Sequence, residues 1–345
     1  MKTKNSILIL TFLIMLISSS VTADNNNSDV FTITPTYKQE KLDSMKMHFI
    51  REGNPKAYLR YLFYSKNRKD RFIYTFYVAN TYYNSYAQFQ LYEMIKEFYK
   101  NIGIEMDSTD NASAIALSYL KNSAKQEEFS AKWEMSKLLL CGIWIPKDTI
   151  AAKEIIYRLC KKEKAEKIWF ANNITYPQMN EREKNKKEKI RNERRMRINN
   201  QIAQINSLID TTAINSSYTQ DELALLKDYF IECGDQNAYN TYIKFCPDEE
   251  NKAMYTFYMA NTHNSAIAQY HMYCMIRDFY ESIGKEMDST ANYIALSYLK
   301  RSAEQEYYPA ELEISILQIH GIENPKDSIS SKVLYNYILT CGKSI

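Results

Sequence analysis

One stretch of this sequence occurs twice, at Ile115–Asp148 and again at Ile294–Asp327. Both copies begin with IALSYLK and end with PKD, and each carries a glycine shortly before that end, Gly142 and Gly321. Alanines recur through each copy at spacings typical of two antiparallel helices whose axes lie close together. A glycine after an apolar helix favours a left-handed cap, and a following proline favours the start of another helix. The stretch therefore predicts a pair of packed helices.

The duplication extends beyond this stretch. Tyr74–Tyr77 recurs as Tyr255–Tyr258, a shift of 181 residues (255 − 74), and the shift becomes 179 (294 − 115) after a two-residue deletion. These shifts define two copies, 37–160 and 218–341. Because 345 residues include only 7 glycines and 7 prolines, we expect helices throughout both copies. In the first copy they are predicted at 39–52, 55–66, 71–83, 85–101, 109–125, 129–141 and 148–164. The predicted N-terminal caps are Asn54, Asp107 and Asp148, with Asp235, Asp288 and Asp327 in the second copy.

The repeated stretch contains small and apolar residues in a recurring order. They are Ala116, Tyr119, Leu120, Ala124, Ala131, Leu138, Gly142, Asp148 and Ala152, then Ala295, Tyr298, Leu299, Ala303, Ala310, Leu317, Gly321 and Asp327. This order resembles the Sel-like repeat (SLR) family, a relative of the tetratricopeptide repeats (TPR) whose unit is an αα-hairpin. The resemblance implies an all-α solenoid of αα-hairpins in two homologous copies joined by a long charged helix. The chain departs from the family where Trp144 and Glu323 replace one glycine, and where Glu127/Glu128 and Glu306 replace another.

A basic segment, 161–217, separates the copies and has no counterpart in either. Residues 161–200 contain 13 Lys and Arg against 6 Asp and Glu, and the run EREKNKKEKIRNERRMRINN favours a helix without an apolar face. Two interpretations of this helical linker stay open. It is either a solvated connecting helix whose end packs on the second copy, or a coiled coil that joins two chains. A short apolar seam is formed by Ile198, Ile202, Ile205 and Ile209.

Residues 1–23 have the features of a signal peptide. Two lysines precede the apolar run Ile7–Ile17, and Val21–Ala23 supplies small residues at a cleavage site. We therefore expect an exported protein, periplasmic or secreted, with a flexible lead-in at 24–36. An uncleaved membrane anchor is the alternative, although the run is short for a transmembrane helix. The formal net charge of +3 is too small to imply an acidic partner.

Histidine and cysteine spacings match no familiar metal site. His271 and Cys274 could share a helical face with His263, but ordinary packing is the favoured interpretation. None of the six cysteines has a cysteine counterpart in the other copy. We therefore expect buried free thiols or local disulfides, with Cys141–Cys160 as the best candidate pair.

Catalytic motifs are missing from the sequence. It contains no glycine cluster of a phosphate-binding loop and no G-x-S-x-G nucleophile motif. Glu134 and Glu313 recur at matched helix positions, but a carboxylate pair must face a cleft to act as acid and base. We expect no enzymatic activity, no cofactor and no metal. Because the basic run has few aromatic residues, we also expect no nucleic-acid partner.

Matched tyrosine and asparagine residues are the tentative partner-binding residues: Tyr77 and Asn80 in the first copy, Tyr258 and Asn261 in the second. Asparagine is mildly unfavourable within a helix and needs compensation. The structural interpretation is that the asparagine bonds to a carbonyl of a neighbouring helix or marks a helix end. A functional one is the binding of an extended peptide on a concave face.

The SLR resemblance implies a non-enzymatic function. We expect an exported helical-repeat scaffold for protein-protein interaction, with an unidentified protein or peptide as its partner. One alternative is an enzyme on an α/α scaffold. The other is a membrane-associated assembly factor that uses the basic linker, or an uncleaved signal segment, against acidic lipid head groups.

Overall fold

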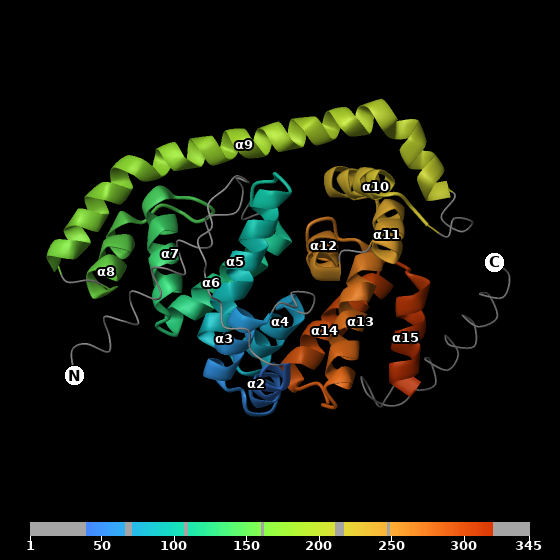
Figure 1. The fold of residues 1–345 in the computed structure, drawn as a ribbon, viewed down its shortest axis with the longest axis horizontal. Coiled ribbons are helices and arrows are strands. Elements are labelled where there is room, and N and C mark those ends of the chain that lie inside the picture. Colours follow the sequence, from blue (N-terminus) through green and yellow to red (C-terminus); the bar gives the residue numbers. More distant parts are fainter. Residues whose placement is uncertain are drawn as a thin grey trace. The chain divides into compact units, whose positions relative to one another are not determined.

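Figure 1 shows a computed structural model of the chain, which describes residues 39–65, 71–106, 110–159, 162–210, 217–246 and 249–319, but not the side chains of 162–184 and 249–250. Every element of regular structure in these ranges is an α-helix, which confirms the predicted all-α fold. The described residues, from Gln39 to Ile319, belong to one compact unit. The expected signal peptide, 1–23, and lead-in, 24–36, lie outside the described residues and stay predictions.

The first half follows the predicted order of helices. Three helices have the predicted bounds, namely α2 (Gln39–Glu52), α5 (Ser85–Asn101) and α7 (Phe129–Cys141). Three more are two residues shorter than predicted, namely α3 (Pro55–Tyr64), α4 (Arg71–Thr81) and α6 (Asn111–Lys125). The prediction of a single helix at 148–164 is wrong. Its place is taken by α8 (Thr149–Leu159) and the beginning of the linker helix α9 (Lys162–Asp210).

The second half repeats the first in the same order. Its helices are α10 (Gln220–Cys233), α11 (Gln236–Phe245), α12 (Glu249–Asn261), α13 (Ala266–Ser282), α14 (Ser289–Ala303) and α15 (Tyr308–Ile319). The two helices of each hairpin pack against each other, and tyrosine side chains link α3 to α4 and α11 to α12, so each half consists of αα-hairpins that bury their apolar faces on their neighbours. Equivalent residues differ by 181 from α2 to α5, and by 179 in α6 and α7.

Side-chain caps fix several of the helix starts. Asn54 accepts hydrogen bonds from two amides of α3, and Asp235 and Asp288 cap α11 and α14 as predicted. Asp148 likewise accepts from the amides of Ile150 and Ala151, at 3.1 and 2.9 Å. Helix α6 is capped by Asp110, since its first turn begins at Asn111. The predicted caps Asp107 and Asp327 lie outside the described residues.

The core of each half is built around a buried phenylalanine within a set of tyrosines. Phe49 and Phe230 occupy equivalent positions, and both are fully buried. The ring of Phe49 lies 5.3 to 5.7 Å from the rings of Tyr58, Tyr61 and Tyr74. The ring of Phe230 lies at the same distances from those of Tyr239, Tyr242 and Tyr255. Tilted and edge-on ring pairs of this kind add to the stabilisation from burial alone.

Helix α9 connects the two halves and contacts α7 and α8 in the first and α10 and α11 in the second (Figure 1). Ile198, Ile205 and Leu208 are buried, whereas Ile202 is 42% exposed. The apolar seam therefore packs within the chain, as in the first interpretation of the linker. This packing lends no support to a coiled coil between two chains. None of the described helices is both long and apolar enough to cross a bilayer.

Candidate partner-binding surface

The two predicted tyrosines are buried at equivalent positions. Tyr77 on α4 and Tyr258 on α12 are each 1% exposed. The Tyr77 hydroxyl donates to the carbonyl of Ile50 at 2.8 Å, and the Tyr258 hydroxyl donates to that of Ile231 at 3.3 Å. Burial raises the pKa of each of the two phenols above the ordinary value for tyrosine. Each tyrosine therefore joins the second hairpin of its half to the first.

The two predicted asparagines are also held by internal hydrogen bonds. The side-chain amide of Asn80 donates to the carbonyl of Phe76 at 2.8 Å and lies 3.0 Å from the Tyr119 hydroxyl. Asn261 has the same two contacts at the same distances, with Phe257 and Tyr298. Asn80 is the next-to-last residue of α4 and Asn261 is the last residue of α12, so both mark a helix end, which favours the structural interpretation. All four residues are buried or nearly so. Their direct contact with a partner stays an untested prediction.

The two halves meet through contacts that are made twice. The Tyr99 hydroxyl lies 2.8 Å from Thr262 Oγ1, and the Tyr280 hydroxyl lies 2.6 Å from Thr81 Oγ1. Tyr99 and Tyr280 are equivalent residues, and so are Thr81 and Thr262. Each half therefore supplies the tyrosine of one contact and the threonine of the other. Such reciprocity is the signature of an isologous interface, here within a single chain.

Aromatic rings repeat the same reciprocal pattern. Phe98 lies 5.3 and 5.6 Å from the rings of Tyr255 and Tyr258. Its equivalent, Phe279, lies 5.3 and 5.4 Å from those of Tyr74 and Tyr77. The hairpin α4–α5 thus packs on α12–α13 about a pseudo-twofold axis. We call this interface the junction.

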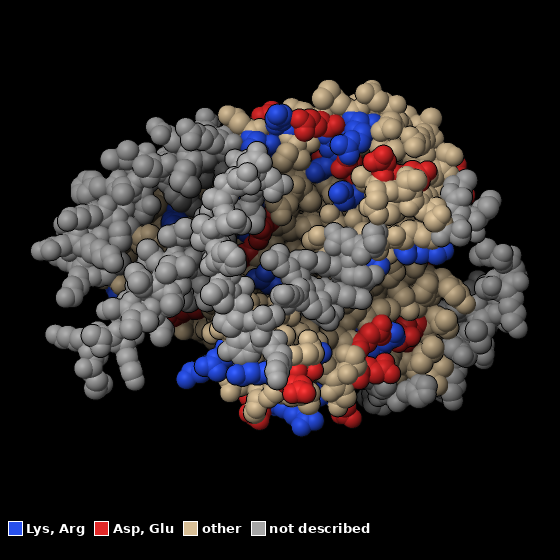
Figure 2. Space-filling model, viewed as in Figure 1, with Lys and Arg blue, Asp and Glu red and all other residues tan. Residues whose placement is uncertain are grey.

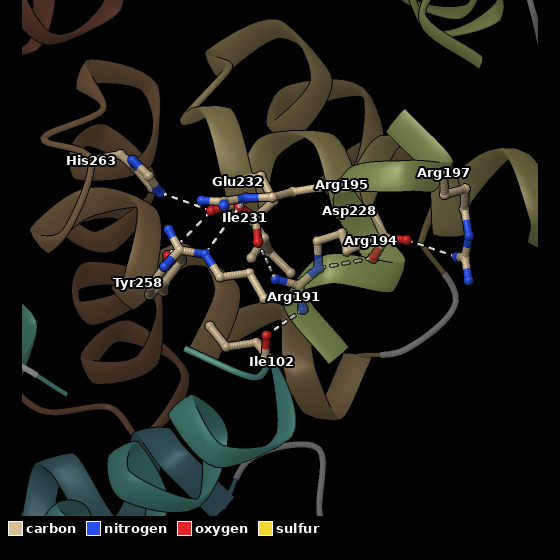
Figure 3. A network of polar contacts seen from close by, with 10 residues as sticks. All are labelled: Ile102, Arg191, Arg194, Arg195, Arg197, Asp228, Ile231, Glu232, Tyr258 and His263. Carbon is tan, nitrogen blue, oxygen red and sulfur yellow. Dashed lines mark hydrogen bonds and ion pairs between the residues drawn. The ribbon is translucent and has the colours of Figure 1, made fainter. Parts of the chain in front are cut away.

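A buried arginine of α9 ties the linker to both halves (Figure 3). Arg194 is 5% exposed. Its guanidinium lies 2.9 Å from Glu232 Oε1 and 3.3 Å from Asp228 Oδ1, both on α10, and donates to the carbonyl of Ile102 at the end of α5. A planar guanidinium can serve these acceptors at once because its donors point in several fixed directions. Arg194 therefore bridges α9, α10 and the first half.

Further arginines of α9 share the same two carboxylates. Arg191 and Arg195 lie 3.4 and 3.1 Å from Glu232, and Arg197 lies 2.7 Å from Asp228. Basic and acidic side chains are accordingly interspersed where α9 crosses α10 (Figure 2). The sequence interpretation of this run as a solvated helix missed the buried Arg194. Arg194 lies four residues from both Ile190 and Ile198, and is therefore on the same helix face as the apolar seam. This spacing is the sequence signal that could have identified Arg194 as buried.

A cavity of about 650 Å³ lies next to Arg194, between α9 and the two halves. Its walls combine apolar side chains with charges of both signs. The lining residues are Arg71, Phe72, Met94, Glu97, Phe98, Asn101, Ile102, Ile190, Glu193, Arg194, Arg197, Lys227, Asp228, Ile231, Asn251, Met254 and Tyr255. Two of the arginines on its wall, Arg194 and Arg197, pair with Asp228 on the same wall.

A second hollow, of about 750 Å³, lies where α6 meets the second half across the junction. Of the four predicted site residues, Asn261 alone is among the residues that line it. Arg301 on its wall donates to Asn264 Oδ1 at 2.8 Å. We call this site the α6 hollow, and its lining residues are Asn111, Ala114, Ile115, Ser118, Asn261, Asn264 and Arg301.

The histidines and cysteines are arranged by packing. His271 Nδ1 lies 3.1 Å from the Tyr239 hydroxyl, and His263 Nε2 lies 3.2 Å from the carbonyl of Ile231. Within the described part of the chain, no group of three or more histidine, cysteine and acidic side chains could hold a metal ion. Cys141, Cys233, Cys246 and Cys274 are free thiols in this structure, but the expectation of burial is correct only for Cys246, because Cys233 is exposed and the other two are half-buried. Cys160, the predicted disulfide partner of Cys141, lies outside the described residues, and so does Cys341.

No protein-family model matches the chain, and no curated protein does. Two solved structures of repeat proteins are similar to it. One is a Sel1 repeat protein from Oxalobacter formigenes, with 14% identity, coverage of 87% of this chain and 99% of that one, and a TM-score of 0.30. The other is c5321, a protective antigen of uropathogenic Escherichia coli with an SLR fold, with 17% identity, coverage of 88% and 57%, and a TM-score of 0.29. The helical-repeat fold itself is established by the chain's own helices.

Proposed function

We propose that this protein is an exported helical-repeat scaffold that binds a protein partner, and that the α6 hollow holds part of that partner. The observation that supports the proposal is the hollow itself, because it combines an open volume with polar side chains held on packed helices. An extended polypeptide offers both amide donors and carbonyl acceptors. The amide of Asn264, the hydroxyl of Ser118 and the guanidinium of Arg301 provide groups of both kinds.

These side chains are held in place before a partner binds, which favours binding. Asn264 Oδ1 accepts from Gln269 at 2.7 Å as well as from Arg301, and Asn261 is fixed by Tyr298. Side chains that are already ordered lose little entropy when a partner binds. In this proposal the protein acts without catalysis and without a cofactor.

The binding proposal is tested by photo-crosslinking from within the hollow. A photoreactive amino acid would replace Ser118, which is exposed on α6, in the full chain expressed in its own cells. The matched control is Ser297, the equivalent serine on α14. We expect one polypeptide to crosslink from position 118 and to be absent or much weaker from position 297. Equal crosslinking from both positions, or none from 118, would contradict the proposal.

The export proposal needs its own measurement. We expect the protein recovered from the exported fraction to begin at Asp24, because cleavage would follow Ala23. Intact-mass spectrometry and N-terminal sequencing would establish the start. A chain that keeps Met1 and sediments with membranes would instead indicate an uncleaved anchor.

A further inference from the structure

The α6 hollow has a counterpart on the other side of the pseudo-twofold axis. Ile115, Ser118 and Asn261 have equivalents of the same residue type there, whereas Ala114 and Asn264 are replaced by tyrosines. We call this counterpart the α14 face. Its residues, in the order of the hollow's, are Thr290, Tyr293, Ile294, Ser297, Asn80, Tyr83 and Asn122.

Two tyrosines stand on the α14 face. The Tyr83 hydroxyl lies 2.7 Å from Thr290 Oγ1, so this side chain reaches from the end of α4 to the start of α14. Tyr293 lies one turn further along α14 and is 76% exposed. Aromatic side chains therefore stand at the positions where the hollow has only Ala114 and Asn264.

Tyr83 is kept at a position that is unfavourable for its side chain. Its φ is 49°, in the left-handed region, and Asn264 has nearly the same φ of 51°. Asparagine tolerates this region, whereas a bulky side chain is strained there. The same backbone thus presents an aromatic ring on one side of the junction and leaves a space on the other.

The walls of the hollow suit an aromatic ring that carries a hydroxyl. Ala114 and Ile115 offer apolar surface, and the Arg301 guanidinium can lie against the face of a ring. Asn111 is the equivalent of Thr290, the residue that meets the Tyr83 hydroxyl, and its exposed amide can donate to or accept from a phenol. The contact of the Tyr83 hydroxyl with Thr290 thus has a counterpart position in the hollow, at Asn111.

We propose that the α6 hollow binds a tyrosine side chain of the partner polypeptide. The ring packs on Ala114, Ile115 and Arg301, and the phenol hydrogen-bonds with Asn111. This inference rests on the proposed function, because it states which side chain of the partner occupies the hollow.

The probe for the test is N-acetyl-L-tyrosinamide, which has the side chain and backbone of a tyrosine within a peptide. The full chain, labelled at isoleucine methyl groups, would be titrated with it by NMR. We expect a shift of the Ile115 methyl signal and none of its equivalent, Ile294. N-acetyl-L-alaninamide, the matched probe without the ring, is expected to shift neither. No shift at Ile115, or the same shift with both probes, would overturn the proposal.

Two variants exchange the two sides of the junction. Ala114→Tyr places in the hollow the side chain that Tyr293 has on the α14 face, so the shift at Ile115 should be lost. Tyr83→Asn combined with Tyr293→Ala opens the α14 face, so a shift at Ile294 should appear. The proposal would be overturned if Ala114→Tyr retained the Ile115 shift. It would also be overturned if the double variant gained no shift at Ile294.

Crosslinking separates failure of this inference from failure of the proposed function. With Ser118 as the crosslinking position, Ala114→Tyr should abolish capture of the partner. Capture that persists would reject the tyrosine anchor and leave the scaffold function standing. No preference for position 118 over 297 in the otherwise unaltered chain would reject the function at this site, whatever the NMR result.

Discussion

Single residues in left-handed conformation mark the turns between paired helices. Glu127, Trp144 and Glu306 have φ values of 66°, 59° and 59°. All three stand where the family resemblance implies a glycine. Glycine adopts this backbone conformation without strain, whereas these three side chains do not. The sequence pattern located these turns but could not show that side chains had been accommodated in them.

We expect Glu306→Gly to stabilise the protein by about 1 kcal/mol, because the substitution relieves a side chain from the left-handed region. The measurement is the free energy of unfolding from urea titration. The control is Glu304→Gly, at a nearby position with right-handed backbone of φ −60°. There glycine should lower stability by about 0.5 to 1 kcal/mol. A loss of stability in both variants would show that Glu306 is not strained.

The buried Glu134 leads to a prediction about how the stability of the protein changes at low pH. Its carboxylate is buried, 2.5 Å from Lys96 and 3.2 Å from Lys137, and accepts from the Tyr92 hydroxyl at 3.1 Å. Burial alone would raise the pKa of Glu134, but the two ammonium groups outweigh it and bring the pKa from 4.5 to about 2. Its contribution to stability is therefore complete above about pH 4.5 and is lost as the pH falls through about 2.

Glu134→Gln should lower the free energy of unfolding by about 2 kcal/mol at pH 7, and the difference should shrink as the pH approaches 2. Urea titrations at pH 7, 4 and 2.5 would measure it. Glu313, the equivalent residue, pairs with Arg277 but is more exposed, at 21% against 8% of the side chain. Glu313→Gln should therefore have the smaller effect. A difference for Glu134 that does not change with pH would contradict this account.

At the scale of elements, α9 acts as a structural part of both halves. Gly103, at the end of α5, lies so close to α9 that a Cβ there would be 2.8 Å from Ile190. Its equivalent, Gly284, has open space at the same position. The linker thus packs closely against Gly103 at the end of α5, but not against the equivalent Gly284. Arg194 sits at this contact, next to Ile190 on the same face of the helix.

We expect Arg194→Lys to lower the free energy of unfolding by about 3 kcal/mol, because an ammonium group cannot reach Asp228, Glu232 and the Ile102 carbonyl together and leaves buried acceptors unsatisfied. Thermal and urea unfolding would measure it. The control is Arg195→Lys, since Arg195 is 52% exposed and makes a single ion pair, which should cost less than about 1 kcal/mol. Equal effects of the two substitutions would mean that burial of Arg194 is unimportant.

At the scale of the whole molecule, the junction makes the halves depend on each other. Phe98 and Phe279 are buried in equivalent contacts, each against tyrosines of the opposite half. Phe98→Ala and Phe279→Ala should therefore cost similar amounts, about 3 to 4 kcal/mol. Both should leave a single unfolding transition, followed by fluorescent labels in each half. Separate transitions for the two halves would contradict the shared core.

Most of the fold could be predicted from sequence, because helix bounds depend on local signals. Caps such as Asn54 and Asp235, and apolar spacing within each helix, placed the ends of most helices to within two residues. The junction could not be derived in this way, because the Tyr99–Thr262 contact joins residues far apart in the chain. The candidate site was predicted only in part. Asn261 lines the α6 hollow, but the roles of Ala114 and Asn264 became apparent only once the halves were paired.

The pseudo-twofold junction has a consequence for how the two sides of the molecule can differ. In a complex of two identical chains, every substitution is present at both symmetry-related places, so a pocket gained at one would be gained at the other. Here the related positions belong to one polypeptide and are encoded separately. One side can keep Tyr83 and Tyr293 as a covered surface while the other keeps an opening at Asn264 and Ala114. Each side can therefore specialise without a matching change across the axis.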